Sequence, residues 1–289
     1  MTQDYRFSFG PWNISEGEDP FGPASREVFP HADKFPLYKK MGFDGVQSHD
    51  DDVVLDIDSK SASQIDKETA EMKRLLDGEG LVPEFVAPRL WFAPETQDGG
   101  ITSSSPSDRA YARDRIRKTV DIANAIDSKA LVFWFAREGS YIRESKNAIQ
   151  SYNRLLAAID DILAYDSSIE IWIEPKPNEP CDQTYCPTIG HAVALAYASA
   201  DHTRVKGLIE TAHAQLAGLD PSDEMAFALA HNNLDCLLRS TILARIVQQI
   251  EQYLSQGMAI ARDFRRRLPA HDKGHALLFG DGSKQPHDF

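Results

Sequence analysis

Short apolar runs recur along this chain, and amphipathic helical patterns separate them. Periodicity predicts six strands, at residues 7–12, 45–49, 82–89, 130–135, 169–174 and 206–210. Helices are expected at 61–77, 108–125, 145–165 and 191–198, the first opened by a Ser61/Gln64 capping box. Strands that alternate with helices are typical of βαβ units. The fold class is therefore predicted to be α/β with a parallel sheet, either the larger part of a (β/α)8 barrel or a doubly wound sheet.

Composition narrows the class of protein. The chain has 289 residues, 42% hydrophobic and 26% charged, enough for one barrel-sized domain or two smaller ones. Its formal net charge of −13 argues against nucleic acid or an anionic membrane as partner. No apolar run approaches the roughly 20 residues that span a bilayer, the first residues do not form a signal peptide, and the three cysteines lack CxxC spacing. We therefore expect a cytoplasmic protein.

Chemically active residue types gather where the predicted strands end. No GxGxxG motif or P-loop follows any strand, which weakens the nucleotide-binding versions of the doubly wound sheet. In a barrel, reactive groups belong at the C-terminal strand ends. Those ends carry Trp12, His49 with Asp50 to Asp52, Trp91, Trp134, Glu174 with Lys176, and Glu210 with His213. Each has an ordinary alternative, such as a core aromatic, a satisfied core histidine or a solvated acidic turn. Six coincident strand ends favour a functional site.

The segment EPKPNEP, at residues 174–180, follows one of the most apolar strands. The alternation of Ile169, Ile171 and Ile173 suits a strand, and period-two geometry sends Glu174 and Lys176 to the same side. The prolines prevent further ladder pairing. An acid and a base are thus expected to project together from this strand end. A proline-rich loop with an ordinary ion pair is the alternative.

Taken in order, the motifs resemble those of the xylose isomerase family, the metal-dependent aldose–ketose isomerases built on a (β/α)8 barrel. The resemblance covers roughly residues 6–230 and rests on RFSFGPW with DPFG, SHDDD, FWFAREG, IEPKPNEP, PTIGHA and GLIETAHAQLAGLD. It implies a barrel of the TIM type over residues 1–234. It also implies a small-molecule sugar substrate, interconverted between aldose and ketose by ring opening and a hydride shift.

The same resemblance implies roles for individual residues. His49 would assist opening of the sugar ring, Asp52 would hold the histidine, and Lys176 would polarise the terminal oxygen of the substrate. The walls of the substrate site would be Trp12, Phe21, Trp91 and Trp134, with Phe21 reaching a neighbouring subunit's site. The metal ligands would be Glu174, Glu210 and His213. Two divalent cations are implied, and these donors suit magnesium, manganese or cobalt.

The chain departs from the family after residue 234. Residues 235–268 have a helical pattern where the family has its last two strands, so strands seven and eight are expected to be missing, together with their metal-binding aspartates. Ala214 replaces a family glutamate, and Asp220, Asp223 or Asp235 could supply a replacement ligand. We therefore expect an incomplete barrel of about six βα units, followed by a helical tail and C-terminal extension at 235–289.

An open barrel leaves two strand edges that need cover. The apolar stripe Ile242, Ile246, Ile250 and Leu254 in the tail predicts such a cover, and homo-oligomerisation through it is expected. Two alternatives to the isomerase remain open: a truncated relative that binds a sugar or a metal without turnover, and a sugar epimerase.

Overall fold

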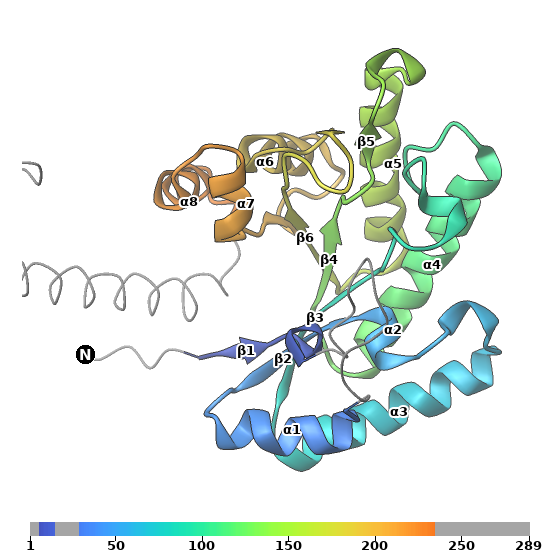
Figure 1. Ribbon diagram of the computed structural model, residues 1–289, viewed down its shortest axis with the longest axis vertical. Helices are drawn as coiled ribbons and strands as arrows, with labels where there is room; N and C mark the ends of the chain where they lie inside the picture. The colour runs from blue at the N-terminus through green and yellow to red at the C-terminus, as the bar shows by residue number, and fades with distance from the viewer. Residues whose placement is uncertain (1–5, 15–28, 235–289) are drawn as a thin grey trace, which may run out of the picture. The chain divides into compact units, whose positions relative to one another are not determined.

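Six parallel strands form the central sheet of the computed structural model, which describes residues 6–14 and 29–234. The strands are β1 (Ser8–Phe9), β2 (Gly45–His49), β3 (Val82–Ala87), β4 (Ala130–Trp134), β6 (Glu170–Glu174) and β8 (Val205–Gly207). Their order in the sheet is their order in the chain, and every neighbouring pair is parallel. A doubly wound sheet would reverse its order at a switch point. The sheet is therefore of the barrel type, and the predicted α/β class is confirmed (Figure 1).

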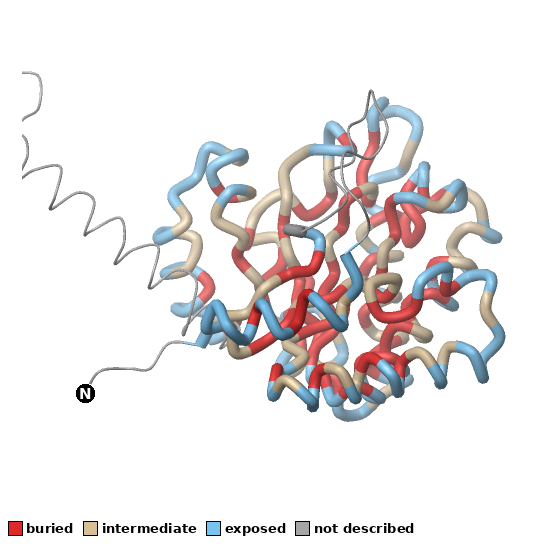
Figure 2. The backbone as a smooth tube through the Cα atoms, turned by 60° about the horizontal axis from the view of Figure 1, so that its bottom comes forward, coloured by how far each residue is buried: buried red, intermediate tan, exposed pale blue. Residues whose placement is uncertain are grey.

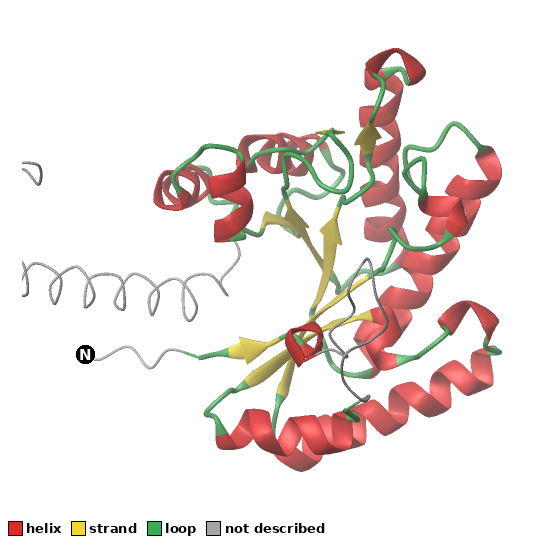
Figure 3. Cartoon of the chain, viewed as in Figure 1, coloured by secondary structure: helices red, strands yellow, loops and turns green. Residues whose placement is uncertain are grey.

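Helices connect successive strands and lie around the outside of the sheet (Figure 3). The longer ones are α1 (His31–Lys40), α3 (Ala62–Glu79), α4 (Pro106–Ala125), α5 (Ala148–Tyr165), α6 (Ile189–Ala198) and α8 (Pro221–Ala230). Short α2 (Asp50–Val53) and α7 (Thr211–Leu216) directly follow strand ends, and the 3-10 turns are η1 (Pro11–Ile14), η2 (Ile57–Ser59), η3 (Pro94–Thr96) and η4 (Arg143–Ser145). The Ser61/Gln64 capping box that opens α3 is confirmed. None of the helices within the described ranges is long and apolar enough to cross a membrane.

Buried residues line the sheet and the helix faces that pack on it (Figure 2). One core cluster consists of Phe85, Ala87, Ala130, Val132 and Trp172. Side chains two positions apart in a strand share a face. Trp134 therefore continues the row of Ala130 and Val132, and Glu174 continues the row of Trp172. The face that packs the core also presents the polar strand-end residues.

A short two-stranded sheet is separate from the main sheet. Its strands β5 (Gly139–Ser140) and β7 (Gln183–Thr184) pair antiparallel. This pairing joins the loop after β4 to the loop after β6, so these two loops support each other at the C-terminal edge.

One isolated bridge lies at the β8 edge of the sheet. Leu234 forms an isolated parallel bridge with Gly207, and the Gly207 amide donates a 2.8 Å hydrogen bond to the Asn233 carbonyl. Within residues 6–14 and 29–234 the sheet contains six strands and this single bridge. The region in which strands seven and eight were expected to be missing lies outside the described residues. The predicted tail stripe at residues 242–254 lies outside the described residues.

Candidate active site

A row of rings crosses the C-terminal edge of the sheet. Neighbouring ring centroids are separated by 4.5 Å for Trp12 and His49, 5.2 Å for His49 and Trp91, 4.5 Å for Trp91 and Trp134, and 6.3 Å for Trp134 and His213. These residues end, or follow, β1, β2, β3, β4 and β8. The topology thus brings together side chains that are up to 201 positions apart in the sequence, as the strand-end rule predicts.

The row offers both apolar faces and polar edges to a ligand. The Nζ of Lys176 lies 5.3 Å from the Trp134 ring centroid, within cation–π range. The indole N–H of Trp134 is buried and has no hydrogen-bond partner among the described residues. Trp12 is 36% exposed, whereas Trp91 is 9% exposed. An aromatic wall with a few convergent polar groups is typical of a small-molecule site.

Glu174 and His213 face each other at the β6/β8 end of the row. The Nδ1 of His213 lies 3.1 Å from Glu174 Oε1, close enough for an ion pair. The angles do not make a hydrogen bond, however, and this buried nitrogen has no other partner in the described chain. A divalent cation binds imidazole nitrogens and carboxylate oxygens, so it could bind between this unpartnered nitrogen and the Glu174 carboxylate. This pair therefore fits a cation.

Glu210, the third predicted ligand, has a local structural task. It is the N-cap of α7, and its Oε2 accepts a 2.8 Å hydrogen bond from the His213 backbone N–H. The sequence pattern predicted residues 206–210 as strand, but β8 ends at Gly207 and Glu210 begins a helix. Its carboxylate orients the turn that carries His213.

Asp220 and Asp223 were considered as replacement ligands. Asp220 Oδ1 accepts a 2.7 Å hydrogen bond from the Ser222 amide at the start of α8, and Asp223 lies in the first turn of that helix. Asp220 therefore caps α8, and Asp223 lies in the acidic first turn of the same helix. Ala214 is buried in α7. Asp235 and the predicted wall residue Phe21 lie outside the described residues.

A more compact donor group lies at the β2 end of the row. Ligand atoms of His49, Asp51 and Asp52 lie within 4.8 Å of one another and could hold a metal ion, and theirs is the one such group of three among the described residues. However, Arg89 Nε lies 2.7 Å from Asp51 Oδ1, and Arg89 Nη2 lies 2.8 Å from His49 Nδ1. The guanidinium thus already provides the positive charge that a cation would bring.

The two acids in this group have different proton affinities. Burial raises the pKa of Asp51, although the charge of Arg89 acts in the opposite direction. Burial would also raise the pKa of Asp52, but hydrogen bonds and charge from His49 outweigh it and lower that pKa. Asp52 is therefore the firmly ionised member of the pair.

The tautomer of His49 depends on whether its Nδ1 forms a hydrogen bond with Asp52 or with Arg89. Asp52 Oδ2 lies 3.1 Å from this nitrogen and also accepts the His49 backbone N–H at 2.8 Å. Arginine only donates, so a bond from Arg89 requires a bare Nδ1, whereas a bond to Asp52 requires a protonated one. The predicted hydrogen bond between Asp52 and His49 Nδ1 therefore competes with the bond that Arg89 donates to the same nitrogen. Arg89 was missed as a site residue, although it ends the predicted strand 82–89.

Asp50 is buried and has a structural role, whereas the ordinary alternative predicted from the sequence was a solvated acidic turn. It is fully buried, and its carboxylate accepts bonds of 2.5 and 2.9 Å from Arg115 and 3.0 Å from Thr119. It also accepts the backbone N–H of Arg89 at 3.2 Å. Burial would lower the pKa of Arg115, but the bonds and charge of Asp50 raise it. Asp50 therefore anchors the ends of both β2 and β3.

Comparison with known proteins gives the family. Residues 35–236 match the family described as xylose isomerase-like TIM barrel, which is most of the chain, so this protein belongs to that family. The resemblance inferred from the sequence is confirmed.

Solved structures with the same fold carry different activities in their names. D-psicose 3-epimerase with D-tagatose from Clostridium cellulolyticum H10 matches with TM-score 0.55 and 15% identity, covering 79% of this chain and 71% of that one. The 3-keto-D-glucoside 4-epimerase from E. coli matches with TM-score 0.54 and 13% identity, and the match covers 81% of this chain and 77% of that one. AP endonuclease, family 2, from Brucella melitensis matches with TM-score 0.53 and 18% identity, and the match covers 77% of this chain and 75% of that one. Such likeness shows a shared fold, and the reaction has to be argued from the site.

Proposed function

We propose that this protein is a sugar epimerase, which moves a proton at a carbon beside a carbonyl group with the help of one divalent cation. The observation that carries the proposal is the buried, unpartnered Nδ1 of His213, 3.1 Å from Glu174 and next to the Trp134 wall. A bound cation would polarise the substrate carbonyl and stabilise negative charge beside it. Magnesium, manganese and cobalt suit the carboxylate and imidazole donors.

The donor count favours proton transfer over a hydride shift. A hydride shift between adjacent carbons, as in the family's aldose–ketose isomerases, relies on two cations that bind the substrate oxygens. The described residues at the β6/β8 end offer Glu174, Glu210 and His213, and Glu210 also caps α7. These donors give one cation a partial shell, with water in the remaining positions. Proton transfer beside a carbonyl group can proceed with one cation and suitably placed acid–base groups.

Acid–base groups lie at both ends of the ring row. His49 lies toward one end, between Trp12 and Trp91, and the Glu174 carboxylate lies at the other. A sugar lying against Trp91 and Trp134 would meet a proton donor or acceptor from two sides, which is the arrangement that inversion of a carbon requires. Lys176, above Trp134, would hold a substrate oxygen and oppose the charge that develops on it.

Aldose–ketose isomerisation is the second candidate function. One observation favours it: His49 lies next to an ionised Asp52, as the ring-opening role that the resemblance implies requires. The two candidates differ in the fate of the transferred hydrogen. Proton transfer exchanges with solvent, whereas a hydride shift does not.

The test uses the full chain with ketoses and aldoses in D2O, with magnesium, manganese, cobalt or EDTA. NMR is expected to show a metal-dependent epimer carrying deuterium at the inverted carbon. Aldose–ketose conversion without deuterium would support the second candidate instead. Absence of turnover with every metal and sugar would refute both.

Two histidine variants test whether His213 is required for metal binding and turnover. His213→Ala is expected to abolish turnover and metal binding, because it removes the unpartnered donor nitrogen. His202→Ala changes an exposed histidine that stacks on Tyr197, and it should leave both unchanged.

A further inference from the structure

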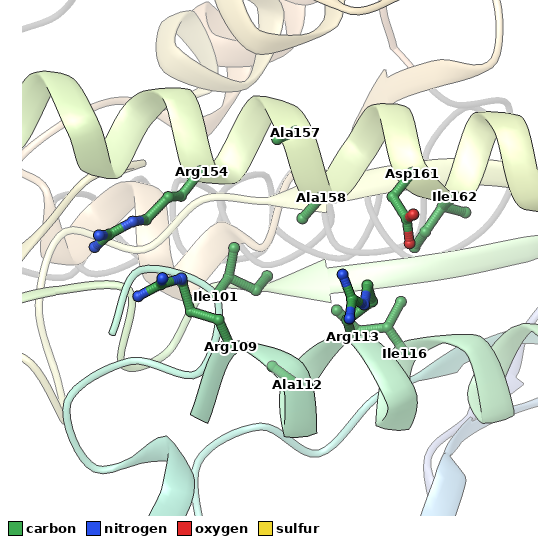
Figure 4. A pocket seen from close by; sticks show the side chains of 10 residues that line it. All are labelled: Ile101, Arg109, Ala112, Arg113, Ile116, Arg154, Ala157, Ala158, Asp161 and Ile162. Carbon is green, nitrogen blue, oxygen red and sulfur yellow. The ribbon is translucent and has the colours of Figure 1, made fainter. Parts of the chain in front are cut away.

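A pocket of about 350 Å³ opens between α4 and α5, on the helical layer outside the sheet. Its lining shares no residue with the candidate active site. Ile101, Ala112 and Ala158 contribute to an apolar floor, and Arg109 and Arg154 stand at one end (Figure 4). The volume lies within the range of small-molecule sites.

The two arginines at this end converge on the same loop. Arg109 Nη1 donates to the Ser103 carbonyl at 2.7 Å, and Arg154 Nη1 donates to the same oxygen at 3.0 Å. Arg109 also donates to Ser104 and Arg154 to Thr102, again through Nη1 and again to carbonyls. A shared acceptor holds the two guanidinium groups next to each other. Figure 4 shows both side chains turned toward the same end of the pocket.

Neither guanidinium has an anionic partner in the described part of the chain. The nearby acids are engaged elsewhere: Asp161 pairs with Arg117 at 2.6 Å, and Asp98 pairs with Lys146 at 3.2 Å. Burial lowers the pKa of Arg154, and the charge of Arg109 lowers it further, although the charge of Asp98 acts in the opposite direction. Tying down the loop at 102–104 uses one nitrogen of each arginine and leaves the Nε and Nη2 donors for another acceptor.

We propose that the α4–α5 pocket binds the phosphate group of a small phosphomonoester, with the organic part lying on the apolar floor. Two adjacent guanidinium groups match the charge of a phosphate monoester, and their planar donor forks suit its oxygens. In a chain of net charge −13, two neighbouring arginines that form no ion pair within the described residues make a local positive site. The bound anion would also offset the repulsion between them. This inference does not depend on the proposed sugar chemistry.

The test is calorimetric titration of the full chain with phenyl phosphate, with inorganic phosphate and with benzoate at constant ionic strength. Phenyl phosphate is expected to bind, more tightly than inorganic phosphate, because only the ester covers the apolar floor. Arg154→Gln should weaken phenyl phosphate binding by about tenfold to a hundredfold, the usual loss for a hydrogen bond to a charged group. Arg74→Gln removes an exposed arginine of α3 and should leave the affinity unchanged.

A second variant separates ligand binding from folding. Ala158→Phe fills the floor without touching either guanidinium, so phenyl phosphate binding should be lost while the ligand-free unfolding temperature is preserved. Three results would overturn the proposal: no phosphate ligand binds at millimolar concentration, Arg74→Gln weakens binding as much as Arg154→Gln, or Ala158→Phe folds normally and binds phenyl phosphate as the parent does. Inorganic phosphate binding as tightly as the ester would overturn the assignment to an organic phosphate.

Discussion

Replacing Asp50 with alanine tests how the acidic turn after β2 supports the active site. The Asp50 carboxylate is fully buried and accepts hydrogen bonds from Arg115, Thr119 and the backbone of Arg89. Its loss would leave the Arg115 guanidinium, itself 5% exposed, without its main partner. Removing one member of a buried ion pair typically costs about 3–5 kcal/mol, because the other charge stays desolvated.

The structure indicates the lower part of that range. Arg115 also contacts the half-exposed carboxylate of Asp58, with Nη1 2.7 Å from Oδ2, and this second acid keeps part of the charge compensated. We therefore expect Asp50→Ala to lower the free energy of unfolding by about 3 kcal/mol. Against a typical total of about 5–15 kcal/mol, the protein should remain folded but be clearly less stable.

Urea denaturation of a small set of variants measures this loss. Asp50→Ala with Arg115→Met removes both charges, so the double variant should be more stable than the sum of the single losses predicts. Asp66→Ala, at an exposed position of α3, is the control and should change stability by less than about 0.5 kcal/mol. A loss below about 1 kcal/mol in Asp50→Ala, or strict additivity in the double variant, would show that the ion pair does not stabilise the turn.

Four further predictions follow from other contacts. Trp134→Ala removes the ring between Trp91 and His213 and should weaken sugar binding about tenfold by calorimetry; unchanged affinity would place the sugar elsewhere. Arg89→Met frees the His49/Asp51/Asp52 group, so metal titration should show one additional cation per chain, and unaltered stoichiometry would contradict this. Burial acts to raise the pKa of Asp166, but amide hydrogen bonds from Ile169 and Ser168 lower it to about 2. The stability that Asp166 contributes is therefore complete above its ordinary pKa and lost as the pH falls through about 2, so in urea melts Asp166→Asn should flatten this acid limb and an identical limb would refute the role. Deleting residues 240–289 should cause aggregation or unfolding in light scattering and thermal melts, whereas a soluble truncation of equal stability would exclude the predicted cover.

The sheet could be predicted from the sequence because its signal is local. The apolar runs at 130–135 and 169–174 nearly coincide with β4 and β6. The first strand was predicted too long: β1 ends at Phe9, and η1 begins at Pro11, whose missing N–H cannot join a ladder. Errors of this kind lie at strand ends, where a cap or a proline overrides periodicity.

The residues of the site were predictable as positions, but their partners were not. The strand-end rule located His49, Trp134 and Glu174 without any knowledge of their contacts. The partner of Asp50 is Arg115, 65 positions away on α4, and no periodicity relates the two. The competition between Arg89 and Asp52 for one ring nitrogen likewise depends on side-chain placement across two strands.

The distribution of positive charge explains why the two ends of the ring row differ. At the β2/β3 end, Arg89 contacts both His49 and Asp51, so a cation there would first have to displace a guanidinium. At the β6/β8 end, no arginine or lysine of the described residues forms an ion pair with Glu174, and His213 Nδ1 lies 3.1 Å from its Oε1. The Lys176 ammonium is drawn toward Glu179, 3.5 Å away. A single cation is therefore electrostatically favoured at the β6/β8 end, and this asymmetry is the reason to expect proton transfer instead of two-cation chemistry.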